Sequence, residues 1–302
     1  MLGLSQLRAF EAVTRAGSFS KAAARLHVTP PAVSLQIRQL EDQYGVRLFE
    51  RIGRRVRLTP AGEALGGYAQ RIFALADDAE RSLQGATGFT GIRLRVAATP
   101  TTAGYHLAPF WKALRQRCPG LELEVSVHNS RRVKERLLAF EDDLGMLGGE
   151  ADHADLVLRP FARNSLVAIV APDHSWARRS WVSVAALGDQ PLIFREPGSE
   201  GRAVVERELK RAGVAPHVVI EVTSTEAVKQ AVEAGAGVGI LATAVVRRDV
   251  DGGYLRALRI RGGDFEMTLS LAYHRERAHS PLLQTILVAV PDLSRTSRRQ
   301  RS

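Results

Sequence analysis

Residues 18–40 read SFSKAAARLHVTPPAVSLQIRQL, and two adjacent prolines interrupt a stretch that otherwise has the pattern of a helix. Thr29 is a good N-cap residue, and Pro30 falls at a first helical position, where its missing N–H costs nothing and its fixed φ suits the helix. The prolines therefore end one helix and begin another at an angle to it. We expect a helix-turn-helix over about residues 19–40.

A further helix precedes this pair. Its apolar stripe has three-residue steps and consists of Leu4, Leu7, Phe10 and Val13. Gly17 and Ser18 should end this helix and cap the next one. The result is a unit of three short helices, in which the third is placed to enter the major groove of DNA.

The third helix has one apolar side and one side suited to DNA. The apolar residues, expected to pack on the first two helices, are Val33, Ile37, Leu40 and Tyr44. Arg, Gln and Ser on the opposite side can bind base edges and phosphates, and Leu35, which is unusual on a solvated face, suits thymine methyl groups. The residues expected to contact DNA are Thr29, Pro31, Ser34, Leu35, Arg38 and Gln39.

The 302-residue chain has a formal net charge of +10, which is concentrated at its two ends. Residues 1–60 hold ten Lys and Arg against four Asp and Glu, and residues 294–302 hold four Arg and no acid. A neutral body with a basic head favours binding of the head to a polyanion. We expect the basic tail at 294–302 to be disordered, either as a solvated end or as a non-specific DNA contact.

Two short alternating runs flank Gly53 in GVRLFERIGRRVRLTPAG and predict a hairpin. Arg51, Arg54 and Arg55 should lie on this hairpin and contact the phosphate backbone as a wing does. Together with the helices, the hairpin completes a winged helix-turn-helix DNA-binding domain over residues 1–59.

A long helix should follow at residues 60–88. Its apolar residues keep the 4-3-4 spacing of a coiled coil, and those expected at a dimer contact are Leu65, Tyr68, Ile72 and Leu75. A single helix that extends beyond a small domain can bury such a seam only against a second copy. We therefore expect a linker helix that joins two chains, and double-stranded DNA with a two-fold related site.

From about residue 91 the pattern changes to strands that alternate with helices, which predicts an α/β architecture with mostly parallel sheets. Several strand-like segments end in loops rich in hydroxyl and amide groups, around Thr99, Asn129, Ser199 and Thr225. Helix N-termini at the carboxyl ends of parallel strands attract anions. These loops are therefore candidates for binding an anionic small molecule.

The segment FEAVTRAGSFSKAAARLHVTPPAVSLQIRQLEDQYGVRLFERIGRRVRLTPAGEAL resembles the DNA-binding head and linker helix of LysR-type bacterial transcriptional regulators. The organisation of the remaining chain is similar to the same family. Many members have Gln after the cap threonine, where this chain has Pro30, so any base contact of that glutamine is absent. The resemblance implies a dimer or tetramer that binds DNA, responds to a small anionic metabolite and acts with RNA polymerase.

The resemblance also implies a two-lobed effector domain, like a periplasmic binding protein, over residues 91–293. The implied lobes are residues 91–162 with 267–293, and residues 163–266. On that model the Thr99–Thr102 loop faces the Arg195–Arg202 loop across a cleft. The residues expected to bind the effector are Thr99, Thr101, Thr102, Asn129, Arg195, Ser199, Arg202 and Thr225.

Three segments, FEDDLGMLGG, FREPGSEGR and TEAVKQAVEAGAGVGIL, are similar to the subgroup that controls Calvin-cycle, or RuBisCO-operon, genes. Effectors of that subgroup are phosphorylated or carboxylated metabolites. Such members usually have Gly-Thr where this chain has Glu200-Gly201, which puts a carboxylate beside the anion site. An effector with an amino or other cationic group, or one held elsewhere in the cleft, is therefore an alternative.

We expect no enzymatic activity, cofactor or metal. The glycine-rich GAGVGI at residues 235–240 would need a preceding strand and a following helix to bind a dinucleotide, and the pattern has the reverse order. It is better explained as a helix end and a tight turn. The histidines are scattered, with only His106 close to the expected cleft, and the single cysteine, Cys118, is expected to be buried.

The chain has no apolar run of membrane-spanning length and no signal-peptide pattern, so we expect a cytoplasmic protein without a membrane partner. The alternative to a regulator is a cytosolic α/β solute-binding or enzymatic domain whose basic head binds RNA or an acidic protein. The heptad seam and the wing favour the regulator, because neither would serve an enzyme.

Overall fold

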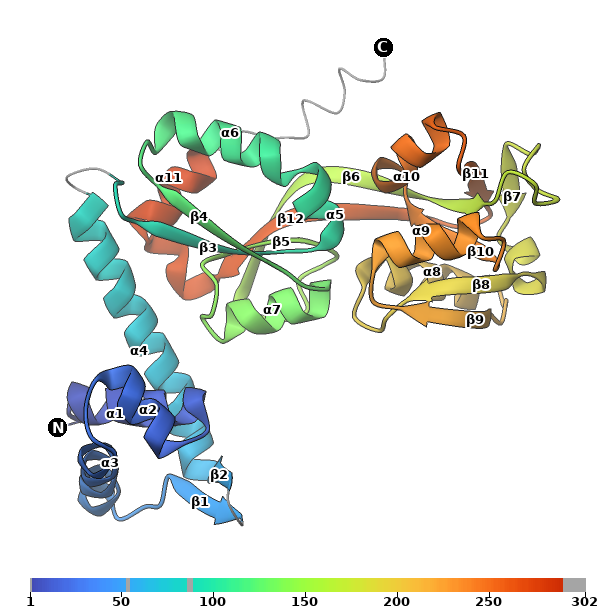
Figure 1. Ribbon diagram of the computed structural model, residues 1–302. Coiled ribbons are helices and arrows are strands. Elements are labelled where there is room, and N and C mark those ends of the chain that lie inside the picture. The colour runs from blue at the N-terminus through green and yellow to red at the C-terminus, as the bar shows by residue number, and fades with distance from the viewer. Residues whose placement is uncertain (1, 53–54, 86–88, 290–302) are drawn as a thin grey trace. The chain divides into compact units, whose positions relative to one another are not determined.

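The computed structural model describes residues 2–52, 55–85 and 89–289. Its contacts divide the chain into two compact units, Met1–Glu80 and Arg81–Ser302. The first unit consists of helices and a hairpin, and the second of strands covered by helices (Figure 1). Within the described ranges, no helix is long and apolar enough to cross a membrane.

The first unit contains three short helices, a hairpin and most of a long helix. Their bounds are α1 (Leu4–Ala16), α2 (Phe19–Leu26), α3 (Pro30–Tyr44), β1 (Phe49–Ile52), β2 (Arg55–Leu58) and α4 (Pro60–Gly85). Thr29 is the extended residue before α3, and Pro30 is its first residue. Strands β1 and β2 pair antiparallel. The winged helix-turn-helix predicted from the sequence is confirmed.

The core of the first unit lies between the three short helices. It includes the buried residues Leu7, Phe10, Val13, Ala22, Val33, Ile37 and Leu40. The Phe10 ring lies 5.3 Å from that of Phe49 and so joins α1 to the hairpin. The predicted burial of Tyr44 is wrong: its side chain is 51% exposed, because it is the last residue of α3 and Gly45 turns the chain away.

Glu41 links α3 to the start of the hairpin, a role that the sequence did not indicate. Its buried carboxylate accepts hydrogen bonds from the amides of Leu48, at 2.7 Å, and Phe49, at 3.3 Å. The guanidinium of Arg47 lies 2.9 Å from the same carboxylate. These contacts satisfy backbone donors that would otherwise be buried without a partner.

The second unit consists of two lobes. The first has β3 (Arg93–Ala98), β4 (Glu122–Val127) and β5 (Leu144–Gly148) with α5 (Pro100–Tyr105), α6 (Leu107–Arg117), α7 (Ser130–Leu138), α11 (Pro281–Ala289) and the 3-10 helix η2 (Arg275–His279). The second has β7 (Trp181–Ser183), η1 (Ala185–Asp189), β8 (Pro191–Arg195), β9 (His217–Val222), β10 (Val238–Ala242) and β11 (Arg256–Arg261) with α8 (Glu200–Arg211), α9 (Thr225–Glu233) and α10 (Thr243–Asp251).

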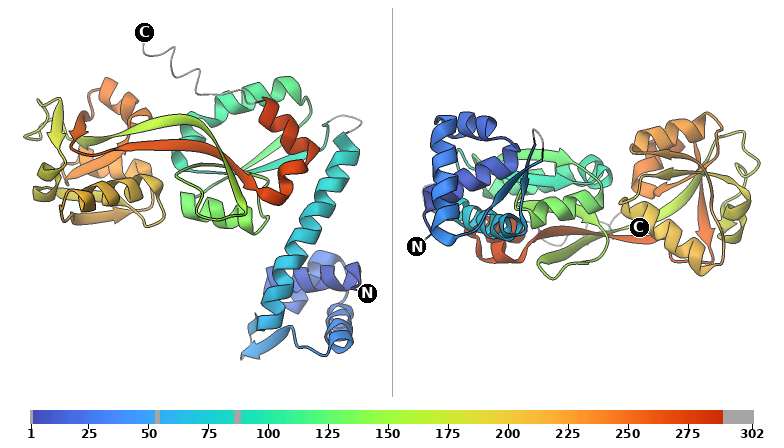
Figure 2. Two further views of the ribbon diagram at one scale, coloured as in Figure 1. Left: turned by 180° about the vertical axis from the view of Figure 1, so that it is seen from behind. Right: turned by 90° about the horizontal axis from the view of Figure 1, so that it is seen from below.

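Two long antiparallel strands, β6 (Leu156–Val170) and β12 (Glu266–His274), belong to both lobes (Figure 2). The sheet order is β4-β3-β5-β12-β6-β10-β8-β9. Pairs within each lobe, such as β3–β4 and β8–β9, are parallel, whereas the pairs that involve β6 and β12 are antiparallel. Residues 166–169 of β6 pair with β10, and the residues before them pair with β12. The α/β, two-lobed fold is confirmed.

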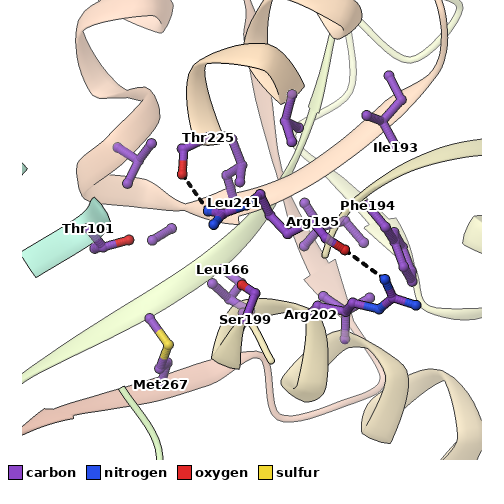
Figure 3. A pocket seen from close by; sticks show the side chains of 16 residues that line it. Thr101, Leu166, Ile193, Phe194, Arg195, Ser199, Arg202, Thr225, Leu241 and Met267 are labelled. Atoms are coloured by element: carbon purple, nitrogen blue, oxygen red, sulfur yellow. Dashed lines mark hydrogen bonds between the residues drawn. The ribbon is translucent and has the colours of Figure 1, made fainter. Parts of the chain in front are cut away.

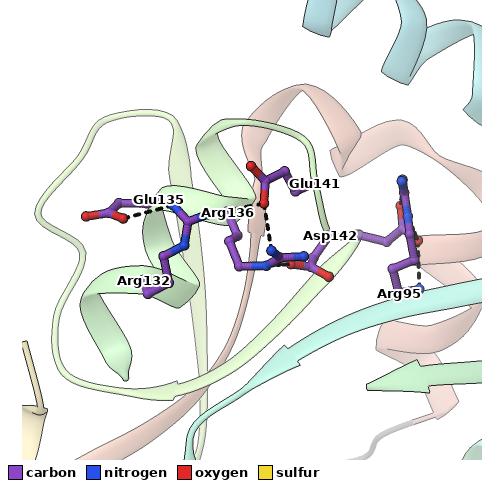
Figure 4. Close-up of polar contacts among 7 residues, drawn as sticks. Arg95, Arg132, Glu135, Arg136, Glu141 and Asp142 are labelled. Atoms are coloured by element: carbon purple, nitrogen blue, oxygen red, sulfur yellow. Dashed lines mark hydrogen bonds and ion pairs between the residues drawn. The ribbon is translucent and has the colours of Figure 1, made fainter. Parts of the chain in front are cut away.

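The acidic segment Glu141–Asp143 holds the entry to β5 through ion pairs. The Nε of Arg136, on α7, donates to Asp142 at 2.5 Å, and its Nη1 lies 2.7 Å from Glu141 (Figure 4). Arg132 lies 3.5 Å from the same Glu141 carboxylate. This part of FEDDLGMLGG therefore stabilises the fold of the first lobe.

Asp143 is a buried carboxylate shared by three arginines. Arg95 of β3 donates to its Oδ1 at 3.0 Å, and Arg81, near the end of α4, lies 2.9 Å from Oδ2. Arg277 of η2 also donates to Oδ1. Burial opposes ionisation of Asp143, but the three positive charges, that of Arg277 above all, outweigh it and lower its pKa from 3.8 to about 2. The start of β5 is thereby joined to three other segments.

Asp143→Asn should lower the free energy of unfolding by about 3–5 kcal/mol, because three guanidinium groups lose their buried anion. Urea denaturation at pH 7 measures this loss. The matched control is Asp173→Asn, at an exposed loop residue of the second lobe, and should unfold as the parent does.

The folded-state pKa of Asp143 is lowered, so its stabilisation is complete above about pH 4 and is lost as the pH falls towards 2. The difference between parent and variant should therefore shrink over that range. Equal unfolding midpoints at pH 7 would contradict a stabilising role for the cluster.

Candidate DNA-binding face and ligand cleft

The outward face of α3 carries the side chains that the sequence assigned to DNA. Exposed on this face are Pro31, Leu35, Arg38 and Gln39, with Ser34 half-buried among them. Leu35 is 54% exposed, whereas Val33 and Ile37 are buried on the opposite side. The Thr29 side chain accepts no capping hydrogen bond, which leaves its exposed hydroxyl at the start of this face. One helix thus presents polar groups and a single apolar side chain together.

The two strands of the hairpin form where the sequence predicted them, but the structure describes only some of the arginine side chains on it. Arg54 lies outside the described residues, and so do the side chains of Arg51 and Arg55. Arg57, on β2, is exposed. The contact of Arg51, Arg54 and Arg55 with phosphates stays a prediction.

The heptad seam of α4 is divided between two faces. Leu65 and Ile72 are partly buried against the core of the first unit. Tyr68 and Leu75, seven residues apart, are 64% and 50% exposed. Leu65 and Ile72 thus contact their own unit without being fully buried, and the contact of all four residues with a second chain stays a prediction.

Two adjoining cavities lie between the lobes of the second unit. Figure 3 shows the side chains that line the larger one. The larger has an empty volume of about 530 Å³ including open solvent, and the smaller about 300 Å³. Both are lined by Thr101 from α5, Ser199 before α8, and Met267 from β12. Arg195 lines both, and Arg202 and Thr225 line the larger one. The loops in which the sequence placed the candidate ligand-binding residues therefore line these cavities.

Two of the predicted threonines are used by the fold instead. Thr99 and Thr102 form a capping box at the start of α5, and both are buried. The hydroxyl of Thr102 donates to the carbonyl of Met146 at 2.6 Å. Thr102 is fully buried, so the expectation that it reaches a ligand is wrong. Thr101 lies between the two, lines both cavities and has no hydrogen-bond partner among the described residues.

Arg195, at the end of β8, is held by neighbouring side chains. Its Nε and Nη2 donate to the two carboxylate oxygens of Glu196, at 2.8 and 3.0 Å. Its Nη1 donates to the Thr225 hydroxyl at 2.6 Å (Figure 3). Asn129, which caps α7 in the first lobe, donates from Nδ2 to the same Glu196 at 3.2 Å. Glu196, which the sequence did not single out, therefore neutralises Arg195 and joins the lobes.

Arg202 is also paired. Its Nε donates to Glu206 at 2.7 Å, and its Nη1 donates to Glu221 at 2.6 Å and to the carbonyl of Arg195 at 2.8 Å. These bonds hold its side chain against the Phe194 ring. Two carboxylates therefore offset the charge of Arg202, and its contact with an effector stays a prediction.

Ser199 is the N-cap residue of α8, but its side chain accepts no capping hydrogen bond. Its hydroxyl and the first backbone amides of α8 are therefore available to a ligand in the cleft. Among the predicted effector residues, Thr101 and Ser199 combine a place at both cavities with a hydroxyl that the described structure does not use.

Two sequence features outside the cleft are explained by packing. The glycines of residues 235–240 follow the end of α9 and lead into β10, and a Cβ at Gly237 would come within 2.4 Å of the Pro191 carbonyl oxygen. His106 packs on the Phe161 ring, 5.5 Å away, and burial lowers its pKa. Within the described residues, no group of three or more His, Cys, Asp or Glu side chains could hold a metal ion.

A winged helix-turn-helix with an exposed recognition helix, joined to a two-lobed domain with an inter-lobe cleft, defines a ligand-responsive DNA-binding regulator. Residues 4–63 match the model for the bacterial regulatory helix-turn-helix protein, lysR family, and residues 88–292 match that for the LysR substrate binding domain. The chain belongs to the LysR family of transcriptional regulators. Its function is regulation of transcription rather than catalysis.

The curated relatives agree with the subgroup that the sequence resembles. The chain is 34% identical to the HTH-type transcriptional activator CmpR of Synechocystis sp., over 94% of this chain and 93% of that one. It is also 34% identical to the RuBisCO operon transcriptional regulator of Acidithiobacillus ferrooxidans, over 92% of this chain and 90% of the relative. The similarity to the RuBisCO-operon subgroup is confirmed.

Two solved structures are informative. Full-length CbnR, in complex with its target DNA, is 26% identical, has a TM-score of 0.66 and covers 96% of this chain and 99% of its own. The regulatory domain of CcmR from Synechocystis PCC6803, in complex with 2-PG, is 29% identical, has a TM-score of 0.61 and covers 68% of this chain and 97% of its own. These likenesses favour a regulator over a solute-binding or enzymatic domain with a basic head.

Leu35→Ser should weaken binding by roughly 1 kcal/mol per contact on operators with a T·A pair at one position of each half-site, because a methyl contact is lost. The salt dependence of binding should not change. Mobility shifts on matched T·A and C·G operators measure the effect, and an equal loss of affinity on both would contradict base reading by Leu35.

The contrasting variant, Arg57→Ala, should weaken binding to every DNA sequence. If Arg57 contacts a phosphate, the slope of log affinity against log salt concentration should also become less steep by about one unit.

Proposed function

We propose that the chain is a cytoplasmic, homo-oligomeric regulator of carbon-fixation genes, with a dimer as its basic unit. It acts on RNA polymerase under the control of a small anionic metabolite. Residues 1–59 bind a two-fold related DNA site, residues 60–88 join two chains, and residues 91–293 sense the effector. The observation that carries the proposal is the exposed face of α3, where Leu35 stands among hydrogen-bonding side chains. An apolar side chain on such a face has a physical use when it contacts thymine methyl groups.

The proposed dimer contact rests on apolar surface that the first unit leaves open. Tyr68 and Leu75 lie one heptad apart on α4, so they point to the same side of the helix. Beside the start of α4 lies an apolar pocket lined by Leu2, Leu40, Tyr44, Val46, Leu48, Ala61 and Leu65. Exposed apolar surface of this kind is typical of a subunit contact.

Leu75→Asp, or Tyr68→Asp, should separate the dimer, because the contact would bury an unpaired carboxylate. Sedimentation should then give a monomer, and operator binding should need at least roughly tenfold more protein. Ala76→Asp, which adds the same charge at the next exposed residue, is the control. A dimer of parent stability in the Leu75 and Tyr68 variants would place the subunit contact elsewhere.

The proposed effector site is the cleft at Thr101 and Ser199. Ser199 offers a hydroxyl and the N-terminal amides of α8 from the second lobe, and Thr101 offers a hydroxyl from the first. Such a helix N-terminus favours an anionic group. The 2-PG complex of the similar CcmR regulatory domain supports a small anion as the ligand class.

Thr101→Ala and Ser199→Ala should each reduce effector binding by about 1–3 kcal/mol, since each removes one hydrogen bond to the ligand. DNA affinity without effector should stay unchanged, because neither residue belongs to the DNA-binding unit. Mobility shifts on the DNA upstream of the coding region, with and without candidate metabolites, test both statements. Ser175→Ala, at an exposed loop residue, is the control. A parent-like response in both variants would contradict the assignment of the cleft.

A further inference from the structure

Glu200 is the first residue of α8 and lines the smaller cavity together with Thr99, Asn129 and Ser199. Its side chain extends from the second lobe to the end of β5 in the first. A Cβ built on Gly149 would come within 2.4 Å of Glu200 Oε2, and one built on Gly148 within 3.3 Å of its Cγ. The carboxylate thus lies inside the inter-lobe cleft, against backbone that only glycine leaves open.

The Glu200 carboxylate has no hydrogen bond or ion pair with any residue in the described part of the chain. Lys134 is the cation whose charge acts on it most, but its Nζ is bound to Asp152 at 2.9 Å and to the carbonyl of Glu150 at 2.8 Å. Burial raises the pKa of Glu200, against the opposing charges of Lys134 and Arg207. A half-buried carboxylate without a donor is destabilised relative to one that a ligand's donor satisfies.

The positive groups of the cleft are already neutralised. Arg195 is bound by Glu196, and Arg202 lies between Glu206 and Glu221. Among the described residues, the cleft side chains that have no protein partner are three hydroxyls, of Thr101, Ser130 and Ser199, and one charged group, the carboxylate of Glu200. A ligand that carries only negative charge meets a like charge at Glu200, whereas an ammonium group would satisfy it.

We propose that Glu200 determines the charge class of the effector: it binds an ammonium or similar cationic group of a ligand whose anionic end lies at Ser199 and the N-terminus of α8. The effector is then zwitterionic, an amino-bearing phosphate or carboxylate. This inference rests on the proposed effector site and adds to it the residue that binds the cationic group of the ligand.

Phosphoethanolamine and phosphoglycolate form a matched pair of probes, because an aminomethyl group in one replaces a carboxylate in the other. Calorimetry on the full-length dimer should give tighter binding of phosphoethanolamine, by about tenfold, as expected for one charged hydrogen bond. Glu200→Gln should weaken phosphoethanolamine and strengthen phosphoglycolate, each by about tenfold, which reverses the preference. Glu233→Gln, an exposed site on α9 with the same charge change, should keep the parent's preference.

The proposal is overturned if the parent prefers phosphoglycolate, or if the ratio of the two affinities is the same in the parent and in Glu200→Gln. Ser199→Ala separates this failure from failure of the site. If Ser199→Ala binds both probes more weakly but Glu200→Gln leaves the ratio of the two affinities unchanged, the role of Glu200 alone is contradicted. Binding that does not depend on Ser199, or absence of binding to the parent and both variants at 10 mM (about 3 kcal/mol of affinity), counts against the site and the inference together.

Discussion

The buried carboxylate of Asp143 is the interaction on which the second unit most depends. Three arginines from segments far apart in the sequence, Arg81, Arg95 and Arg277, share this one anion. The cluster holds the start of β5, which lies between β3 and β12 in the sheet. At the other end of β5, Gly148 lines the smaller cavity and Gly149 lies beside Glu200. One strand thus connects the ion-pair cluster at Asp143 to the inter-lobe cleft.

The two lobes are joined by polar contacts as well as by β6 and β12. The amide of Arg131, at the start of α7, donates to the carbonyl of Gly198 at 3.2 Å, and Asn129 donates to Glu196 nearby. Tyr105 of α5 donates to the carbonyl of Val245 on α10 at 3.0 Å. A ligand that binds Thr101 and Ser199 together would have a higher affinity for the arrangement of the lobes in which these contacts form. Such a difference in affinity between two arrangements is what allows an effector to shift the population from one to the other.

In the first unit, helix α4 packs on the core with one side and exposes apolar side chains on another. Ala69 of α4 is buried and Leu65 and Ile72 pack beside it, whereas Tyr68 and Leu75 stay exposed. The winged helix-turn-helix therefore uses α4 to complete its own core and still leaves a surface that a second chain can cover. This division explains how a small DNA-binding unit is stable while its linker helix remains available for association.

The sequence by itself determined the order of the elements, the helix-turn-helix at the prolines, the outward face of α3 and the loops that line the cleft. These follow from local properties: the fixed φ of proline, the periods of helix and strand, and the placement of helix caps. Only the tertiary structure decided which groups are free to bind. Thr101 lines the cavities, whereas the hydroxyl of Thr102 donates to Met146. Arg195 and Arg202 are neutralised by Glu196, Glu206 and Glu221. Glu200 has no partner in the part of the chain that the structure describes. Hydrogen bonds and ion pairs depend on distances in space between residues that can lie far apart in the chain, and the periodicity of a sequence carries no record of those distances.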